Sequence, residues 1–317
     1  MTDMQNEVFK TPVNKIRLFE HGAPGSQNFK LTRKYYTEDM PDGRVKHIVQ
    51  NITDPDIVPY IPDGIGNSTD RQRIPAVLII PGGAFRRLVY NFEGEDVAKW
   101  LNSMGIAAFV LECRLPSDEH DNAEDVPLID AMRAMRVIRG RAQEFGIDEA
   151  KIGVMGFSAG GFMAALLSTA YESDVYADYK YKDEYDKLSA RPDFAVCSYP
   201  VISIDDCIEA GKRYMSEEQV LERISDSKAK ILHKYNPDKL VRPDMPPVFI
   251  CETDDDRTTL SENSVGFYMA ARKAGVSAEL HIFRTGGHGY GCGDDFAQTG
   301  EWKVLFTKWI KSIGIIS

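Results

Sequence analysis

The segment KIGVMGFSAGGFMAALL, residues 151–167, joins a strand-like run to a helix-like run through a tight turn. Residues 151–156 are mostly apolar, as in a buried strand, and residues 159–171 have the composition of a helix. Between them lies a Gly-x-Ser-x-Gly pentapeptide centred on Ser158, a pattern that chance alone places in roughly a tenth of chains this long. The strand-turn-helix setting projects Ser158 from the carboxyl edge of a sheet, above a helix N-terminus that favours negative charge. The segment therefore predicts Ser158 as a nucleophile.

The sequence on either side alternates between short apolar runs and stretches with helical spacing. Predicted strands cover residues 76–80, 106–111, 151–156, 194–199, 247–251 and 278–283. Predicted helices cover residues 93–104, 128–145, 159–171, 261–274 and 301–313. This alternation is typical of βαβ units and predicts an α/β fold whose mostly parallel central sheet has helices on both faces.

Two parts of the chain depart from the alternation. Residues 1–70 are irregular apart from a strand predicted at 45–52, and we expect them to form an extension packed on a domain of residues 71–317. Within that domain, residues 172–192 and 203–245 are insertions. Insertions of this length are often lids or binding loops, and the sequence leaves open the alternative of a solvated surface extension.

A serine hydroxyl needs a base to remove its proton, and the base should be a histidine later in the chain. Of the histidines that follow Ser158, His233 lies in the second insertion and His281 lies inside a predicted strand. His288 stands in the loop GGHGYG, residues 286–291, directly after the last predicted strand. Because a glycine-flanked loop lets the imidazole reach over the sheet edge, we predict His288 as the base.

The acid that orients this histidine should follow the strand at 247–251. The sequence offers Glu252, Asp254, Asp255 and Asp256 there, and strand geometry does not choose among them. A cluster of aspartates also suggests a metal site, but no matching set of histidine or carboxylate ligands accompanies it. We therefore expect neither a metal nor an organic cofactor.

Backbone N–H groups are expected to hold the negative charge that develops on a substrate carbonyl oxygen. The glycine-rich segment PGGAF, residues 81–85, follows the strand at 76–80 and can bring its amides close to a substrate. Gly83 and Ala84, together with Ala159 after the nucleophile, are the predicted donors of this oxyanion hole.

The composition excludes several classes of function. A formal net charge of -10 argues against nucleic acids and anionic membrane surfaces as partners, because both attract basic proteins. No apolar run approaches the ~20 residues that span a bilayer, and the N-terminus lacks the layout of a signal peptide, so we expect a cytoplasmic protein. The cysteines are scattered and odd in number, which favours free thiols over disulfides or a zinc site. They are Cys113, Cys197, Cys207, Cys251 and Cys292.

Several long segments together resemble one family. They are PGGAF (81–85), EGEDVAKWLNSMGIAAFVLECRLP (93–116), DAMRAMRVIRGRAQEFGIDEAKIGVMGFSAGGFMAA (130–165), SYPV (198–201) and DRTTLSENSVGFYMAARKAGVSAELHIFRTGGHGYG (256–291). They cover most of residues 75–315 and resemble the acetyl esterase and acetylxylan esterase-like branch of the α/β-hydrolases. This branch is close to the bifunctional feruloyl and acetylxylan esterases and to the hormone-sensitive-lipase-like enzymes.

The resemblance implies an α/β-hydrolase fold with small lid insertions, and it selects an acid. In the family the acid stands eight residues before the serine of an ENS-like stretch, which is Ser264 here, so Asp256 is implied and Asp255 is the second choice. The family often has His-Gly where this chain has Glu252-Thr253, and usually has Val-Pro at residues 258–259. The residues expected to border the substrate pocket are Phe85, Arg86, Phe157 and Tyr290.

We therefore expect a Ser-His-Asp esterase that hydrolyses short-acyl esters, such as acetate on xylo-oligosaccharides. The alternatives are a peptidase or lipase on the same fold, and a binding protein that kept the fold without activity. The insertions are too polar for a typical lipase lid, residues 1–70 leave little room for a peptidase's extra domain, and non-catalytic relatives usually lose a member of the triad. The only expected partner is a small-molecule ester, and homo-oligomer formation stays open.

Overall fold

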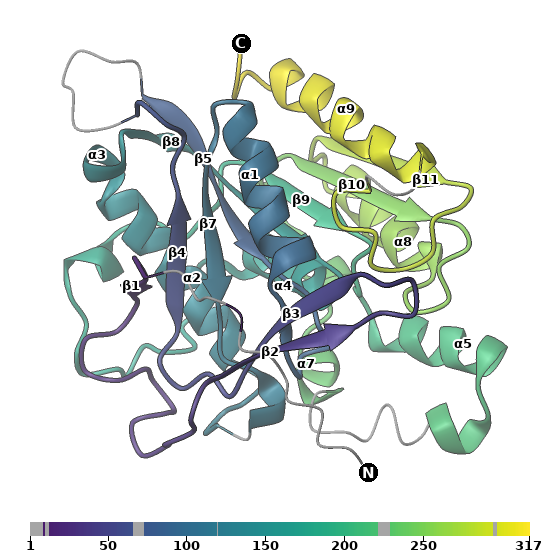
Figure 1. The fold of residues 1–317 in the computed structure, drawn as a ribbon, viewed down its shortest axis with the longest axis horizontal. Helices are drawn as coiled ribbons and strands as arrows, with labels where there is room; N and C mark the ends of the chain where they lie inside the picture. Colours follow the sequence, from purple (N-terminus) through teal and green to yellow (C-terminus); the bar gives the residue numbers. More distant parts are fainter. Residues whose placement is uncertain (1–8, 10–12, 66–72, 119, 221–228, 294–296) are drawn as a thin grey trace.

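The computed structural model describes residues 9, 13–65, 73–118, 120–220, 229–293 and 297–317. Their strands form an eight-stranded sheet in the order β1-β4-β7-β5-β8-β9-β10-β11 and a three-stranded sheet, β2-β3-β6 (Figure 1). The strands are β1 (Ile16–Arg17), β2 (Lys34–Asp39), β3 (Val45–Gln50), β4 (Asp56–Tyr60), β5 (Ile74–Ile80), β6 (Leu88–Val89), β7 (Ala107–Glu112), β8 (Ile147–Phe157), β9 (Ala195–Ser198), β10 (Val248–Thr253) and β11 (Ala278–Phe283).

The large sheet is parallel from β7 to β11, and at one edge β4 pairs antiparallel with β7 and β1 pairs antiparallel with β4. Its central strands β5 and β7 have the sequences IPAVLII and AAFVLE and are buried along almost their whole lengths. A parallel sheet that is covered on both faces requires such continuous apolar runs. The six strands predicted from the alternation are present, so the mostly parallel central sheet is confirmed.

Helices cover both faces of this sheet. α1 (Asp96–Ser103) and α9 (Ala297–Ser312) share one face, where the rings of Trp100 and Trp302 meet edge to face with centroids 4.9 Å apart. α2 (Val126–Gly140), α4 (Ala159–Ala170) and α8 (Ser261–Lys273) cover the other face (Figure 1). The predicted helix at 93–104 begins instead as a π-helical turn, Asn91–Glu95, and the one predicted at 128–145 is divided at Arg141 into α2 and α3 (Ala142–Phe145).

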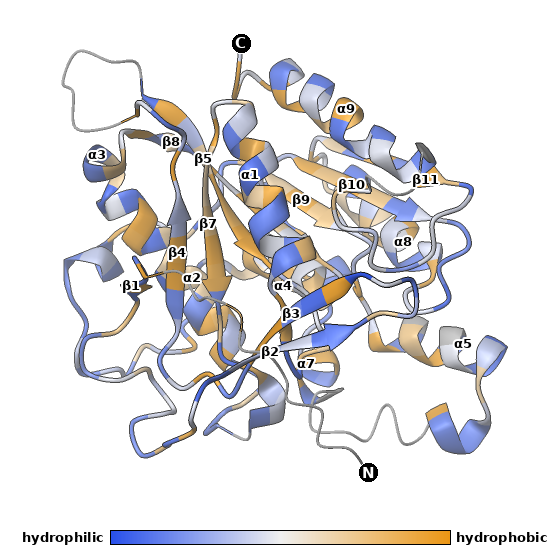
Figure 2. Ribbon diagram, in the orientation of Figure 1, coloured by the Kyte–Doolittle hydropathy of each residue, from blue (hydrophilic) through white to orange (hydrophobic). Residues whose placement is uncertain are grey.

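The apolar side chains of these elements form one continuous core. Figure 2 shows the hydrophobic strands at the centre of the molecule and hydrophilic residues on the outward sides of the helices. α4 is buried along nearly its whole length and packs against β5, β8, β9 and α2. This packing fixes the N-terminus of α4, and the residue before it, relative to the sheet edge.

Residues 13–60 do more than pack on the large sheet, because β1 and β4 belong to it. The sequence does not indicate β4 because Pro59 lies inside it. β1 pairs only with Asp56 and Ile57, so in the described chain β4 has no neighbour on that side at Pro59, and a proline is tolerated there. The strand predicted at 45–52 is confirmed as β3, which forms a hairpin with β2. The domain boundary predicted at residues 70–71 lies outside the described residues.

The buried side chain of Arg114 connects α2 to the segment around residues 24–26. Arg114 Nη2 lies 2.7 Å from Asp130 Oδ1, and neither side chain is exposed. Arg114 also donates to Ser26 Oγ at 2.8 Å and to the carbonyl of Pro24. Because an unpaired charge at this depth would be costly, these contacts hold the segment in one position.

The two predicted insertions contain short helices. The first holds a 3-10 helix, Glu184–Lys187, and the second holds α5 (Ile204–Tyr214), α7 (Ala229–Lys234) and a 3-10 turn, Pro237–Lys239. Residues 221–228 of the second insertion lie outside the described chain. Among the helices of the described chain, none is both long enough and apolar enough to span a membrane.

Candidate active site

Ser158 stands between β8 and α4, where the pentapeptide predicts it. Its φ of 53° and ψ of -118° are uncommon for a residue with a side chain. The flanking glycines are required by the tight turn, since a Cβ on Gly156 would collide with the carbonyl of Gly160, and a Cβ on Gly160 with the carbonyl of Ile80. The turn thus holds Ser158 at the carboxyl end of the parallel strands.

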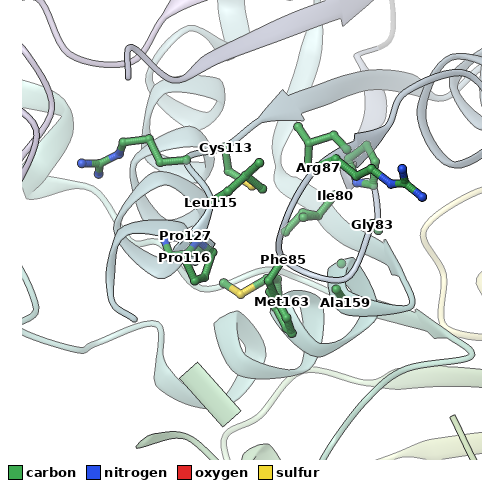
Figure 3. Close-up of a pocket in the computed structure, with 15 residues that line it drawn as sticks. Ile80, Gly83, Phe85, Arg87, Cys113, Leu115, Pro116, Pro127, Ala159 and Met163 are labelled. Carbon is green, nitrogen blue, oxygen red and sulfur yellow. The ribbon is translucent and has the colours of Figure 1, made fainter. Parts of the chain in front are cut away.

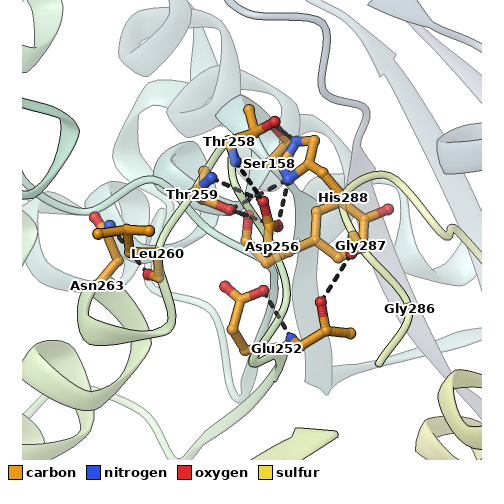
Figure 4. Close-up of polar contacts among 12 residues, drawn as sticks. Ser158, Glu252, Asp256, Thr258, Thr259, Leu260, Asn263, Gly286, Gly287 and His288 are labelled. Carbon is orange, nitrogen blue, oxygen red and sulfur yellow. Dashed lines mark hydrogen bonds and ion pairs between the residues drawn. The ribbon is translucent and has the colours of Figure 1, made fainter. Parts of the chain in front are cut away.

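Three side chains that follow three different strands form an unbroken line of hydrogen bonds (Figure 4). His288 Nε2 lies 2.8 Å from Ser158 Oγ, and His288 Nδ1 lies 2.6 Å from Asp256 Oδ2. Because an ionised carboxylate can only accept, Nδ1 carries the ring proton and Nε2 accepts from the Ser158 hydroxyl. The structure therefore brings the predicted nucleophile, base and acid into contact, in the order that proton transfer needs.

Asp256 is bound as an ionised acceptor. It is 2% exposed, and its Oδ1 accepts from the amides of Thr258 at 2.7 Å and Thr259 at 3.0 Å. Burial opposes its ionisation, but the hydrogen bonds from His288 and from these amides outweigh burial and hold the pKa of Asp256 below its ordinary value. Thr259 also donates from Oγ1 to Oδ2 at 2.9 Å. The proline that the resembled family usually has at this position would supply neither donor.

The other aspartates of the cluster have different contacts. Asp255 is exposed, and its Oδ1 accepts from the amides of Gly286 at 2.9 Å and Gly287 at 2.8 Å. It therefore shapes the loop that carries the histidine and does not touch the ring nitrogens. Asp254 is exposed as well, and its amide bonds to the carbonyl of Phe283.

The predicted oxyanion donors lie around the same serine. The segment after β5 passes directly against Ser158, because a Cβ on Gly82 would come within 2.9 Å of the Ser158 Cβ. Gly83 and Ala84 follow with φ values of 140° and 58°, which bend the backbone sharply there. Ala159 is the first residue of α4, and the first amides of a helix have no acceptor within it.

A pocket of about 260 Å³ opens over Ser158 and His288. The β2–β3 hairpin contributes Met40, Arg44 and Lys46 to its wall, so the N-terminal residues take part in the site. The described residues of the two insertions contribute nothing to this lining. The remaining lining residues are Gly83, Ala84, Arg87, Val89, Phe92, Glu93, Thr258, Gly286 and Gly289.

The four residues predicted to border the pocket do not line it. Phe85 lines a separate cavity of about 10 Å³ (Figure 3), and its ring packs edge-on against α4. Phe157 and Tyr290 are buried, and both rings pack against Tyr199. Arg86 is exposed outside the pocket. A position next to a motif does not place a side chain in the pocket. Phe157 precedes Ser158 directly, but successive residues of a strand point to opposite faces of the sheet.

The BD-FAE family model matches residues 65–270, which is more than half of the chain. The chain belongs to the BD-FAE family. Over 240 residues it is 31% identical to the acetylxylan esterase of Xylanibacter ruminicola, in an alignment that covers 75% of this chain and 45% of that protein. The chain thus spans less than half the length of this curated relative.

Solved structures show the same fold. An acetyl ester-xyloside bifunctional hydrolase from Caldicellulosiruptor lactoaceticus is 37% identical, with a TM-score of 0.67 and coverage of 83% of this chain and 90% of that one. A carboxylesterase from Lactobacillus plantarum is 20% identical, with a TM-score of 0.67 and coverage of 90% and 99%. This BD-FAE family chain therefore has the α/β-hydrolase fold, as the sequence predicts.

Glu93 is a residue of the site that the sequence analysis does not identify. It is 5% exposed, and its carboxylate accepts from the amide of Gly82 at 2.8 Å and from Tyr199 Oη at 2.9 Å. Tyr199 Oη in turn accepts from the amide of Gly291 at 3.0 Å, so Glu93 connects the oxyanion segment to the loop of the histidine. Burial raises the pKa of Glu93, although the nearby basic groups of His288 and Lys46 and both hydrogen bonds favour the ionised form. The sequence did contain a signal for Glu93, because it lies on the same side of the predicted helix at 93–104 as the apolar residues that face the core.

A second buried carboxyl group lies near the acid of this BD-FAE family chain. Glu252 accepts from the amide of Thr253 at 2.9 Å (Figure 4). It also accepts from Ser264 Oγ at 3.3 Å. Burial and then the charge of Asp256 raise the pKa of Glu252 well above its ordinary value. Both effects favour the protonated form of Glu252 beside the negative charge of Asp256.

Proposed function

We propose that the chain is a serine esterase that hydrolyses short-acyl esters, acetate esters first among them. The hydrogen-bonded line from Ser158 through His288 to Asp256 carries the proposal. Family membership supports it, and so do the names of the relatives, which are an acetylxylan esterase, an acetyl ester hydrolase and a carboxylesterase.

In this mechanism His288 Nε2 takes the hydroxyl proton of Ser158 as Oγ bonds to the ester carbonyl carbon. The carbonyl electron pair moves onto oxygen, where the amides of Gly83, Ala84 and Ala159 stabilise the negative charge. When the carbonyl re-forms, the bond to the alcohol oxygen breaks and His288 gives that oxygen its proton. Water then attacks the acyl-enzyme by the same steps, which releases the carboxylic acid and restores Ser158.

For the substrate we propose acetylated carbohydrate, such as acetylated xylo-oligosaccharides. One relative is named an acetylxylan esterase, and one solved structure is described as an acetyl ester-xyloside hydrolase. The pocket of about 260 Å³ lies below the roughly 300–1,000 Å³ of sites for drug-sized ligands, which supports a small substrate.

The experiment that tests the proposal measures acetate release from acetylated xylo-oligosaccharides beside p-nitrophenyl esters of graded acyl length. We expect the highest kcat/KM for acetyl esters and covalent labelling by a fluorophosphonate probe. A preference for long acyl chains would indicate a lipase, and cleavage of peptide substrates alone would indicate a peptidase. A folded protein that neither turns over esters nor reacts with the probe would be a binding protein.

Glu93 offers a prediction on activity. We expect Glu93→Leu to lower kcat for p-nitrophenyl acetate by about 10²-fold, the effect of losing one oxyanion donor, because the Gly82 segment and Tyr199 lose their common acceptor. Leaving their two donors unsatisfied also destabilises the fold by about 1–3 kcal/mol each. Glu93→Gln keeps one acceptor, so its kcat should lie between those of wild type and Glu93→Leu. Steady-state kinetics below the melting temperature of each variant decide the matter: a kcat for Glu93→Leu equal to wild type rules out this positioning role.

A further inference from the structure

The charges of the pocket wall narrow the class of substrate. Three basic side chains line the pocket: Arg44 and Lys46 on the β2–β3 hairpin, and Arg87 after β5. The whole chain has a formal net charge of -10, so this basic wall departs from the average surface. Glu93 is the one carboxylate in the described lining, and it is buried and already accepts two hydrogen bonds.

Ion pairs within the protein neutralise two of the three basic groups. Arg87 Nη1 lies 2.5 Å from Glu38 Oε1, and Arg44 Nη2 lies 2.8 Å from Asp42 Oδ2. Lys46 has no carboxylate oxygen within 4.0 Å in the part of the chain that the structure describes. Glu38 lies opposite Lys46 in the β2–β3 register, and the charge of Lys46 acts on Glu93, but Glu38 is paired with Arg87 and Glu93 is bound by two donors. The half-buried ammonium group of Lys46 is therefore the basic group of the wall that forms no ion pair with a described residue.

A partly desolvated ammonium without an ion pair favours an anionic ligand, because Coulomb attraction strengthens as water is excluded. A single charge of this kind matches a carboxylate. A phosphate monoester carries more charge and is typically bound by several donors, often by the fork of an unpaired arginine. In this pocket both arginines already bind carboxylates of the protein.

We propose that the substrate is an acetate ester of an alcohol that carries a carboxylate, such as a uronic acid, and that Lys46 binds this carboxylate. The charge belongs to the alcohol half because an acetyl group has none. The apolar side chains of Met40, Val89 and Phe92 line the same pocket and offer a surface for the ring of such an alcohol. This inference rests on the proposed esterase function and adds the chemical class of the alcohol.

The test compares two acetyl esters of one sugar ring that differ in a single group. One is an O-acetylated methyl glucuronoside with a free carboxylate, and the other is the uncharged amide of the same compound. For the wild-type protein we expect kcat/KM to be about tenfold higher for the acid, the lower end of the effect of a charged hydrogen bond. In Lys46→Gln the acid and the amide should be hydrolysed with similar kcat/KM. Lys311→Gln changes an exposed lysine of α9 outside the pocket and should keep the wild-type ratio.

Salt supplies a readout that needs no variant. Rising ionic strength should lower kcat/KM for the acid and leave that for the amide unchanged, because salt screens only the charged pair. The inference is overturned by equal rates for the two esters in wild type, by a ratio that Lys46→Gln leaves unchanged, or by turnover of neither sugar ester. Hydrolysis of p-nitrophenyl acetate is measured in the same assays. If this ester is hydrolysed but the acid is not preferred over the amide, the inference fails while the proposed esterase function stands.

Discussion

Alanine in place of Ser158 is expected to lower kcat for p-nitrophenyl acetate by at least about 10⁴-fold, because the members of such a triad act as a unit. The substitution removes the oxygen that would bond to the acyl carbon, and His288 then has no hydroxyl proton to take. The rate that remains would come from substrate binding and from the oxyanion amides. Release of p-nitrophenolate, corrected for hydrolysis without enzyme, measures the loss.

The same substitution should leave the fold intact. Ser158 is 8% exposed, and the change removes one oxygen whose partner is His288. We expect a melting temperature close to that of wild type, and we expect Ser103→Ala, an exposed serine of α1, to keep full activity. A folded Ser158→Ala protein with wild-type turnover would refute the serine mechanism.

The meeting of Ser158 and His288 could be predicted because local patterns fix both residues. A pentapeptide between a strand and a helix places Ser158, and a glycine-rich loop after the last strand places His288. Since the carboxyl ends of parallel strands share one edge of a sheet, the alternation of strands and helices then brings the two together. The 2.8 Å contact between Nε2 and Oγ follows from this topology.

The wall of the pocket could not be predicted in this way. β2 and β3 pair with each other, and β3 then pairs with β6, which is about forty residues further along the chain. Neither a helical nor a strand period indicates where such a hairpin docks. Its position over Ser158 brings Lys46 into the site. Glu93 escaped prediction for a related reason, because its partners come from two other loops.

The identity of the acid could be predicted only in part from the sequence. One carboxylate lies near the end of β10 and three follow the strand, and only resemblance to a family favoured Asp256 over Asp255. The structure gives each aspartate its own partners: Asp256 contacts His288, while Asp255 contacts two glycine amides. A matched pair of isosteric substitutions can therefore separate the two roles.

Asp256→Asn is expected to lower kcat by about 10⁴-fold with little change in KM, as observed when such an acid is neutralised. Asparagine has the shape of aspartate, but it lacks the charge that stabilises a protonated His288. Its amide group can also donate to Nδ1, which moves the ring proton to Nε2 and prevents that nitrogen from accepting from Ser158. Kinetics of p-nitrophenyl acetate hydrolysis measure this loss.

Asp255→Asn is the matched control, and its expected effect is much smaller. The amide oxygen of asparagine can still accept from Gly286 and Gly287, so the histidine loop keeps both hydrogen bonds. We expect kcat within about tenfold of wild type, the scale of one weakened hydrogen bond. If Asp255→Asn were the more damaging of the two, Asp255 would be the acid and the contact between His288 and Asp256 would have another purpose.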